Sequence, residues 1–256
     1  MINVEPRLAE VTRVTATLPN LPDAFDGLTL VQTSDWHMGE WMTLDKMLSI
    51  AQQINALKPD MILHTGDYVG RALKNVLSDV TQSLQAFEAR EGIYGTLGNH
   101  DYHHVKAADV VNAVERAGNT QMLRNAHARI QRGDSVLYIA GVDDIWENKQ
   151  NLNQALDGIP VNSTVILLAH EPDFADVVST SGRVSLQLSG HTHGGQFRLP
   201  ITGALVLPRY GQKYDMGLYN IGDMVLYVNR GLGMIPPYVR FNCPAEITHF
   251  TLRTSV

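Results

Sequence analysis

The feature that most constrains this chain is a pattern that recurs five times along it. A short apolar run ends, and polar residues with glycine follow at once, after Thr33, Leu63, Leu97, Ala169 and Leu188. Short apolar runs of this kind are typical of buried strands. In open α/β sheets, ligands bind outside the carboxyl ends of the strands. The five polar segments are therefore expected to converge on one side of a sheet.

Helical patterns alternate with these runs, which predicts a mixed α/β architecture. Apolar residues at helical spacing predict helices over residues 44–57, 76–89 and 107–117, the last of which ends at Gly118. Strands are expected over residues 28–32, 61–63, 93–97, 136–140, 165–169, 186–188, 218–221, 225–228 and 248–252. Loops are expected over residues 34–40, 65–71 and 98–102, and Gly222-Asp223 predicts a hairpin turn.

The length and composition limit what this chain can be. Its 256 residues are enough for one large domain over residues 1–256, and 44% of them are hydrophobic. A net charge of -6 argues against a stable complex with nucleic acid, because phosphate backbones bind clustered Lys and Arg. The single cysteine, Cys243, excludes an intrachain disulfide and a cysteine-based zinc site. Any metal site must therefore use His, Asn and carboxylates.

The given chain has no obvious membrane-targeting segment. Residues 1–10 contain Glu5, Arg7 and Glu10 and lack the apolar core of a signal peptide. No run of about 18 apolar residues is present anywhere, so a spanning helix is not expected. A cytoplasmic or peripheral membrane location is the expectation, although a chain trimmed of an upstream anchor would look the same.

Each of the five polar segments offers oxygen or imidazole ligands. They are Asp35-Trp36-His37, Gly66-Asp67, Gly98-Asn99-His100-Asp101, His170 and Gly190-His191-Thr192-His193. Mixed nitrogen and oxygen ligands suit Mn, Fe, Zn, Co or Ni. Taken singly, each segment has an ordinary explanation, such as a turn for Gly-Asp or a structural role for a strand-end histidine. Five of them in this order, each at a strand end, predict a metal site.

The order Asp-x-His, Gly-Asp, Gly-Asn-His-Asp, His, Gly-His-x-His resembles that of calcineurin-like metallophosphoesterases, and the resemblance covers about residues 28–253. Residues 194–196 and the segments 229–231 and 240–244 look like a bacterial branch of phosphodiesterases. Some members of that branch hydrolyse UDP-diacylglucosamine. The resemblance implies a four-layer α/β/β/α sandwich.

The resemblance also implies a role for each candidate residue. Asp35, His37 and His193 would hold a first divalent metal ion, and Asn99, His170 and His191 a second. Asp67 would bridge the two ions. His100 would lie beside the ions without binding them, and Asp101 would orient its imidazole. Mn²⁺ is the expected metal, with Fe, Zn, Co and Ni as alternatives.

Three further residues are candidates for substrate contacts. Many family members carry an acidic residue or Asn and then an Arg shortly after the Gly-Asp motif, whereas this chain has Gly70 and then Arg71. Arg71 could still contact phosphate, as could Arg230, and His103 could line the substrate path. The apolar segment 231–238 is either packed inside or forms a rim for a lipid tail or a membrane surface.

These features lead to a hypothesis of function. The chain is expected to be a phosphodiesterase in which a hydroxide shared by two metal ions attacks phosphorus in line, with His100 as the general acid. The substrate would be a small or lipid-linked phosphodiester. One alternative is a UDP-diacylglucosamine-type pyrophosphatase. More distant ones are a metal-dependent amidohydrolase, which would normally open with His-x-His, and a non-catalytic scaffold. The oligomeric state is left open.

Overall fold

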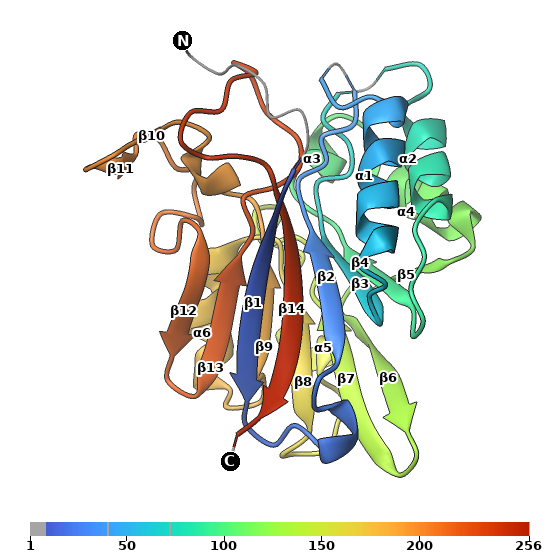
Figure 1. Ribbon diagram of the computed structural model, residues 1–256, viewed down its shortest axis with the longest axis vertical. Helices are drawn as coiled ribbons and strands as arrows, with labels where there is room; N and C mark the ends of the chain where they lie inside the picture. Colours follow the sequence, from blue (N-terminus) through green and yellow to red (C-terminus); the bar gives the residue numbers. More distant parts are fainter. Residues whose placement is uncertain (1–8, 40, 72, 256) are drawn as a thin grey trace.

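The computed structural model describes residues 9–39, 41–71 and 73–255. The predicted absence of a signal peptide concerns residues 1–8, and the loop predicted over residues 34–40 includes Glu40, so these positions lie outside the described residues. Two sheets lie face to face in the centre of the molecule, with helices beyond them (Figure 1). Among the described residues, no helix is both long enough and apolar enough to span a bilayer.

The first sheet has the strand order β1-β14-β2-β3-β4-β5. Its strands are β1 (Glu10–Leu18), β2 (Thr29–Thr33), β3 (Met61–Thr65), β4 (Ile93–Thr96), β5 (Thr120–Met122) and β14 (Glu246–Thr254). Strands β2 to β5 run parallel to one another. β14 pairs antiparallel with β2 and parallel with β1. The carboxyl ends of β2, β3 and β4 therefore lie along one edge of the sheet.

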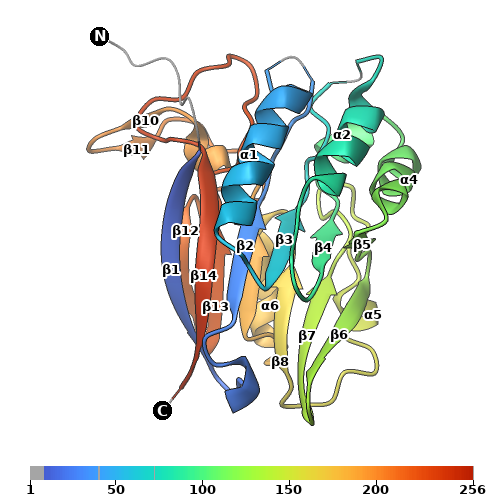
Figure 2. The same ribbon diagram turned by 45° about the vertical axis from the view of Figure 1, so that its right-hand side comes forward.

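The second sheet has the order β12-β13-β9-β8-β7-β6. Its strands are β6 (Ala126–Arg132), β7 (Ser135–Gly141), β8 (Thr164–Leu168), β9 (Leu186–Ser189), β12 (Gly217–Ile221) and β13 (Met224–Val228). Strands β7, β8, β9 and β13 are parallel, and the hairpin predicted at Gly222-Asp223 joins β12 to β13. The carboxyl ends of β8 and β9 point to the same end of the molecule as those of β2 to β4 (Figure 2).

Three separate apolar cores hold four layers together. The helices α1 (Leu44–Ala56), α2 (Val76–Gln85) and α4 (Ala107–Ala117) pack on the first sheet through residues such as Ile54 and Val80. Leu30 and Leu137 belong to the core between the two sheets. A third core joins the second sheet to α6 (Ala175–Thr180) and α5 (Leu152–Ala155). The α/β/β/α sandwich predicted from the resemblance is confirmed.

The sequence patterns located the central elements better than the edges. The predicted helix over 76–89 ends earlier, at Gln85, and the predicted loop over 98–102 contains the short helix α3 (His100–His103). The strands β1, β5 and β6 were not predicted. β1 is an edge strand whose apolar residues are interrupted by threonines and Arg13, and most of it is only partly buried. Its partner β14 arrives from the other end of the chain, so no local pattern indicates the pairing.

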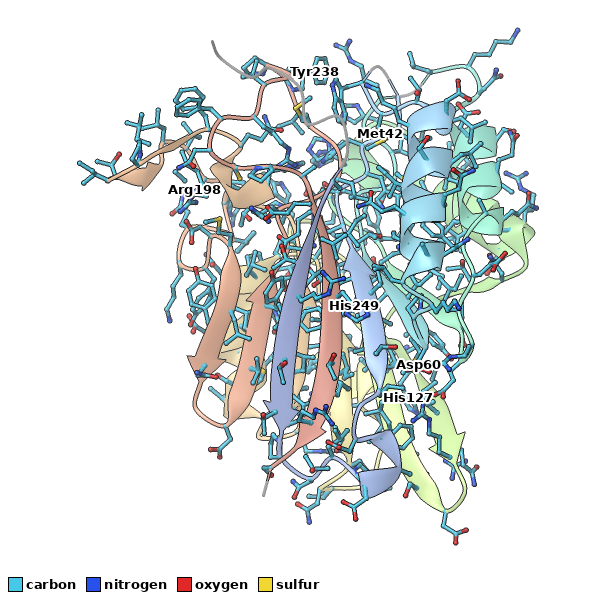
Figure 3. The ribbon with its side chains drawn as sticks, viewed as in Figure 1. Met42, Asp60, His127, Arg198, Tyr238 and His249 are labelled. Carbon is cyan, nitrogen blue, oxygen red and sulfur yellow. The ribbon has the colours of Figure 1, made fainter. Side chains whose placement is uncertain are left out.

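Short elements complete the chain: η1 (Asp23–Phe25), η2 (Pro172–Phe174), η3 (His193–Gly195), β10 (Arg198–Leu199) and β11 (Gly203–Ala204). The β10–β11 hairpin stands away from both sheets (Figures 1 and 2). Arg198 of this hairpin, Met42 and Tyr238 lie in the half of the molecule that contains the carboxyl ends of the central strands, whereas Asp60 and His127 lie in the other half (Figure 3).

Candidate metal centre

The predicted ligands sit on loops that leave the carboxyl ends of strands in both sheets. Several of these residues adopt a left-handed backbone conformation, with a positive φ that is uncommon for residues other than glycine. They are Asp35 (φ 49), His37 (φ 47), Asp67 (φ 57), His191 (φ 72) and His193 (φ 51). Such conformations persist only where the surrounding structure imposes them, and they cluster at functional sites. The backbone is thus bent so that these side chains turn toward one point.

One group of ligand atoms belongs to Asp35, His37 and His193, and these three side chains are buried. The Nε2 atoms of the two histidines are 3.0 Å apart. Oδ1 of Asp35 lies 3.4 Å from Nε2 of His193 and 3.9 Å from Nε2 of His37. Three donor atoms of mixed type within this distance of one another could surround a single cation.

Asp67 connects this group to the rest of the site. Its Oδ2 lies 3.4 Å from Nε2 of His37 on one side and 3.2 Å from Nε2 of His170 on the other. Asp35, Asp67 and His170 form a second group of three donor atoms. One carboxylate therefore stands within reach of imidazoles that come from two different sheets.

Hydrogen bonds fix which nitrogen of two histidines faces the site. Nδ1 of His170 lies 2.6 Å from the carbonyl oxygen of Thr65 and donates to it, which leaves the Nε2 lone pair for the site. That Nε2 is buried and has no hydrogen-bond partner. Nε2 of His191 donates to the carbonyl oxygen of Arg209 at 2.8 Å, so Nδ1 faces Oδ1 of Asn99 at 3.1 Å. Both arrangements are those expected of metal-binding imidazoles.

The electrostatics of the cluster suit metal ligands. Burial lowers the pKa values of His37 and His191 to about 3, so both imidazoles are neutral at pH 7. Burial raises the pKa of Asp35 to about 6, which leaves it ionised at pH 7. Burial would also raise the pKa of Asp67, but the charges of His170 and His100 hold it well below its usual range. Burial would lower the pKa of His170, but Asp67 and Asp35 raise it well above its usual range, so this imidazole must lose its proton before Nε2 can bind a cation. Neutral imidazoles and ionised carboxylates are the forms that bind divalent cations.

His100 lies at the edge of this cluster. Its ring packs edge-on against that of His37, with 4.6 Å between centroids, and its backbone N–H donates to Oδ1 of Asp67 at 2.8 Å. Its Nδ1 is buried without a hydrogen-bond partner. His100 also lines the cavities that open on both sides of the cluster, so its imidazole can reach a molecule bound there.

The hydrogen bonds of Asp101 differ from those that the resemblance implied. Its Oδ2 accepts hydrogen bonds from the backbone N–H groups of Gly98 and Asp67, both at 3.0 Å, and its Oδ1 accepts from Val69 at 3.1 Å. The carboxylate is directed at backbone amides rather than at the imidazole of His100. Because a buried carboxylate needs several donors, it ties the loop after β4 to the loop after β3. These contacts tie Asp101 to the backbone on both sides of Asp67, whereas its orienting role toward His100 stays a prediction.

The departure from the family pattern at Gly70 has a steric reason. A Cβ atom at this position would lie 2.7 Å from both Cβ and the carbonyl oxygen of His37, which is closer than real Cβ contacts allow. Any side chain here would push His37 out of place. Arg71 follows at the rim of a smaller hollow of about 170 Å³, which His100 and His104 also line.

The other two substrate-contact candidates have protein partners of their own. His103 is exposed, its ring centroid lies 6.0 Å from that of His100, and its Nε2 lies 3.0 Å from Oε1 of Glu147. Arg230 is held by the sheet: its Nε donates to Glu246 at 2.9 Å, and its guanidinium lies 3.1 Å from Glu10. These acidic partners on β14 and β1 direct Arg230 away from the cavities, so the prediction that it contacts phosphate has no support in its geometry.

Sequence reasoning missed most of the cavity that adjoins the cluster. This cavity, of about 470 Å³, has Asp67, Asn99, His100, His191 and His193 at its inner end. Its other lining residues are Trp146, Thr192, Gly195, Gln196, Phe197, Leu205, Val206, Pro208, Ile235, Pro236, Pro237 and Val239. The only sequence signal was the apolar segment 231–238. Leu232 and Met234 of this segment are buried, as the packing interpretation expects, while residues 235–237 line the cavity.

The chain resembles several known proteins. It is 37% identical over 98% of its length to the uncharacterized metallophosphoesterase YkuE of Bacillus subtilis, of which it covers 88%. It is 31% identical over 95% of its length to a protein of Danio rerio named transmembrane protein with metallophosphoesterase domain, of which it covers only 57%. Among solved structures, NAD nucleotidase (NadN) of Haemophilus influenzae has a TM-score of 0.52 and 15% identity, over 80% of this chain and 45% of that one. This last likeness concerns the fold alone.

A family model described as calcineurin-like phosphoesterase matches residues 28–195. The matched segment contains every candidate ligand from Asp35 to His193, so the family pattern coincides with the cluster that the fold assembles. Together with the likeness to YkuE along nearly the whole chain, this match shows that the chain belongs to the calcineurin-like phosphoesterase family.

Proposed function

We propose that this protein is a phosphodiesterase that works with two divalent transition-metal ions. The observation that carries the proposal is the position of Asp67, whose Oδ2 stands between Nε2 of His37 and Nε2 of His170 at 3.4 and 3.2 Å. A carboxylate placed between two groups of nitrogen and oxygen donors is what a dinuclear centre requires. The fold, the family and the clustered ligands support this activity.

The ligands divide between the two ions according to their contacts. Asp35, His37 and His193 would hold the first ion, because their donor atoms all lie within 4.8 Å of one another. Asn99, His170 and His191 would hold the second. Asp67 would be shared. Mn²⁺ is the metal that we propose, and a mixture of imidazole, amide and carboxylate donors can also hold Fe, Zn, Co or Ni.

The ions and the protein would supply different parts of the chemistry. When bound, the ions supply a positive charge that activates water at neutral pH and stabilises the charge that develops on the phosphoryl oxygens. The Arg209 carbonyl and the Thr65 carbonyl hold the imidazoles of His191 and His170 in the tautomers that metal binding needs. Asp101 fixes the loops that carry Asp67 and Asn99 through three backbone hydrogen bonds.

His100 is the proposed general acid. A group with this role must reach the leaving oxygen without being occupied by another partner. The His100 imidazole lies beside Asp67 and His37, and it borders the space where an ester would sit. It would donate its proton to the departing alkoxide. Arg71, at the rim of the hollow next to His100, is the proposed contact for a phosphoryl oxygen.

The test is hydrolysis of a substrate panel by protein that has been stripped with a chelator and then reloaded with Mn²⁺. The proposal expects turnover of bis(p-nitrophenyl) phosphate, slower turnover of p-nitrophenyl phosphate, and loss of both after chelation. Faster turnover of the monoester would reverse the proposed preference. Activity confined to UDP-diacylglucosamine would replace the proposal with the lipid-linked pyrophosphatase alternative, and inactivity on the whole panel would contradict a hydrolytic role.

A further inference from the structure

The cavity beside the metal cluster has walls of a different chemical character from its inner end. One wall is the hairpin segment, defined as residues 196–206, which contains β10 and β11. The facing wall is the closing segment, defined as residues 235–239. Branched aliphatic residues and prolines dominate both walls, including Leu205, Val206, Ile235 and Pro237. The inner end consists of the candidate metal ligands and His100. Whatever enters the cavity must therefore meet both an apolar wall and the cluster.

The hairpin segment is fixed to the loop that carries His191 and His193. Gly195, which has a φ of +79°, lets the hairpin approach closely: a Cβ atom there would lie 2.5 Å from Cβ of Ala204. Arg198 donates to the carbonyl oxygen of Gly194 at 2.9 Å and pairs with Asp215 at 2.6 Å. The apolar wall is therefore positioned relative to the candidate ligands by direct contacts.

The two walls are also joined to each other. The Gln196 side chain accepts a hydrogen bond from the backbone N–H of Ile235 at 2.7 Å and donates to its carbonyl oxygen at 3.0 Å. The rings of Phe197 and Phe241 stack with 4.8 Å between centroids. The Gln196 contacts connect the hairpin segment to the closing segment, and the stacked phenylalanines connect it to the residues just beyond, so the cavity lies between two loops that are far apart in the sequence.

The walls offer little to a polar ligand. Apart from the candidate ligands, His100 and Trp146, the polar side chains that line the cavity are Thr192 and Gln196. The Thr192 hydroxyl donates to the carbonyl oxygen of Asp215 at 2.6 Å, and the Gln196 amide is occupied by Ile235. A sugar or nucleobase placed here would lose its hydrogen bonds to water without replacing them. By contrast, Val206 is 78% exposed and Leu205 56%, so both would gain from apolar contact.

We propose that this cavity binds an unbranched aliphatic chain carried by the substrate on the same phosphate that the metal ions hold. This inference rests on the proposed phosphodiesterase function and names its substrate class. The occupant is the substrate's own chain, because the same cavity is lined by the apolar walls and by candidate metal ligands. A methylene group takes up about as much space as a water molecule, roughly 30 Å³, so a chain on the order of ten carbons fits the volume.

A series of alkyl p-nitrophenyl phosphates tests the proposal, with methyl, butyl and octyl esters used at concentrations where they remain monomeric. The leaving group is the same throughout, so differences report the alkyl chain. The Mn²⁺-loaded protein should show kcat/KM rising by up to about fourfold for each buried methylene. The rise should appear mainly in KM, because the chain is bound equally in the ground and transition states. A value of kcat/KM that does not change with chain length would overturn the inference.

Two variants of the hairpin segment test whether the dependence of kcat/KM on chain length arises in the cavity. Val206→Asn places an amide in the cavity wall and should reduce the octyl-to-methyl ratio of kcat/KM by about tenfold. Ile201→Asn is the matched control, because Ile201 is 97% exposed at the hairpin tip and does not line the cavity, so its ratio should equal that of the wild type. Equal reductions in both variants would assign the effect to the outer hairpin surface and refute the cavity proposal.

The two proposals can fail separately. Hydrolysis of the methyl ester with no gain for longer chains would leave the phosphodiesterase function standing and remove only the aliphatic subsite. If Mn²⁺-loaded protein hydrolysed none of the esters, the proposed function would fail first, and the subsite inference would fall with it.

Discussion

The inner end and the walls of the cavity beside the metal cluster are built in contrasting ways. The inner end comes from residues that directly follow central strands of both sheets, such as Asp35 after β2 and His170 after β8, and its polar atoms are buried and held by backbone groups. The walls come from the hairpin segment and the closing segment, whose apolar side chains are partly exposed. In the two proposals, residues at the strand ends perform the reaction, and the outer loops determine which substrate binds.

The largest expected effect lies at the inner end. Asp67→Asn keeps the size of the side chain but removes the charge that stands between His37 and His170. Because metal ions contribute several kcal/mol to such reactions, kcat on bis(p-nitrophenyl) phosphate should fall by about 10³-fold or more. Steady-state kinetics at saturating Mn²⁺ measure this loss. Asp223→Asn, in the β12–β13 turn, is the control and should behave as the wild type. Near-normal activity of the Asp67 variant would remove Asp67 from the centre.

A smaller loss is expected for the proposed general acid. His100→Gln should reduce turnover of a dialkyl phosphate by about 10²-fold or more, because the alkoxide leaving group needs a proton. Turnover of nitrophenyl esters should fall much less, and the metal content should not change. The matched variant His104→Gln alters a neighbouring exposed imidazole of the same hollow. Equal losses on both kinds of ester would show that His100 is not the proton donor.

The contact between the hairpin segment and the loop that carries His193 can be tested by measuring the free energy of unfolding. Gly195→Ala adds a methyl group against Ala204 at a positive φ, and we expect it to lower the free energy of unfolding by about 2–3 kcal/mol. Gly222→Ala is the control, since φ is +60° there but no atom lies within 4 Å of an added Cβ. Urea unfolding should therefore show a smaller loss for Gly222→Ala. Equal losses of unfolding free energy in both variants would mean that the hairpin segment is not in close contact with the loop that carries His193.

The smallest expected effect is on the pH dependence of stability, and it comes from the buried residue His64. Burial lowers the pKa of His64 to about 3, and its Nδ1 lies 2.6 Å from the Thr33 hydroxyl. The unfolded chain takes up a proton near pH 6.5 and the folded chain does not, so this contribution to stability is complete above pH 6.5 and is lost as the pH falls toward 3. Between pH 6.5 and 5.5, the wild type should lose about 1 kcal/mol that His64→Asn does not lose. Identical pH dependence in urea unfolding would contradict a neutral buried His64.

The same contrast explains how much could be predicted from the sequence. The candidate ligands could be found because a sheet brings strand ends together, so local motifs such as Gly190-His191-Thr192-His193 already specify where their side chains meet. The contacts of Asp101 were not predicted, because the direction of its carboxylate depends on backbone amides of the loop after β3. The contacts of Arg230 were not predicted either, because its acidic partners lie on β1 and β14, far away in the sequence.

Most of the residues that form the cavity walls could not be predicted from the sequence. The hairpin segment has no motif, and its position depends on Gly195 and on the contact of Arg198 with Gly194. The apolar character of residues 231–238 was visible in the sequence, but the sequence could not separate buried Leu232 from cavity-lining Ile235. Which side of a loop faces a cavity is decided by the loop packed against it, and here that partner is Gln196, about forty residues earlier.

The central claim is that Asp67 is shared by two ions, and metal content tests it most directly. Protein stripped with a chelator, reloaded with Mn²⁺ and freed of excess metal should contain about two manganese ions per chain by elemental analysis. Asp67→Asn, treated in parallel, should contain fewer. Wild-type protein that retains at most one ion per chain, or an Asp67→Asn variant that retains two, would contradict a dinuclear centre built on Asp67.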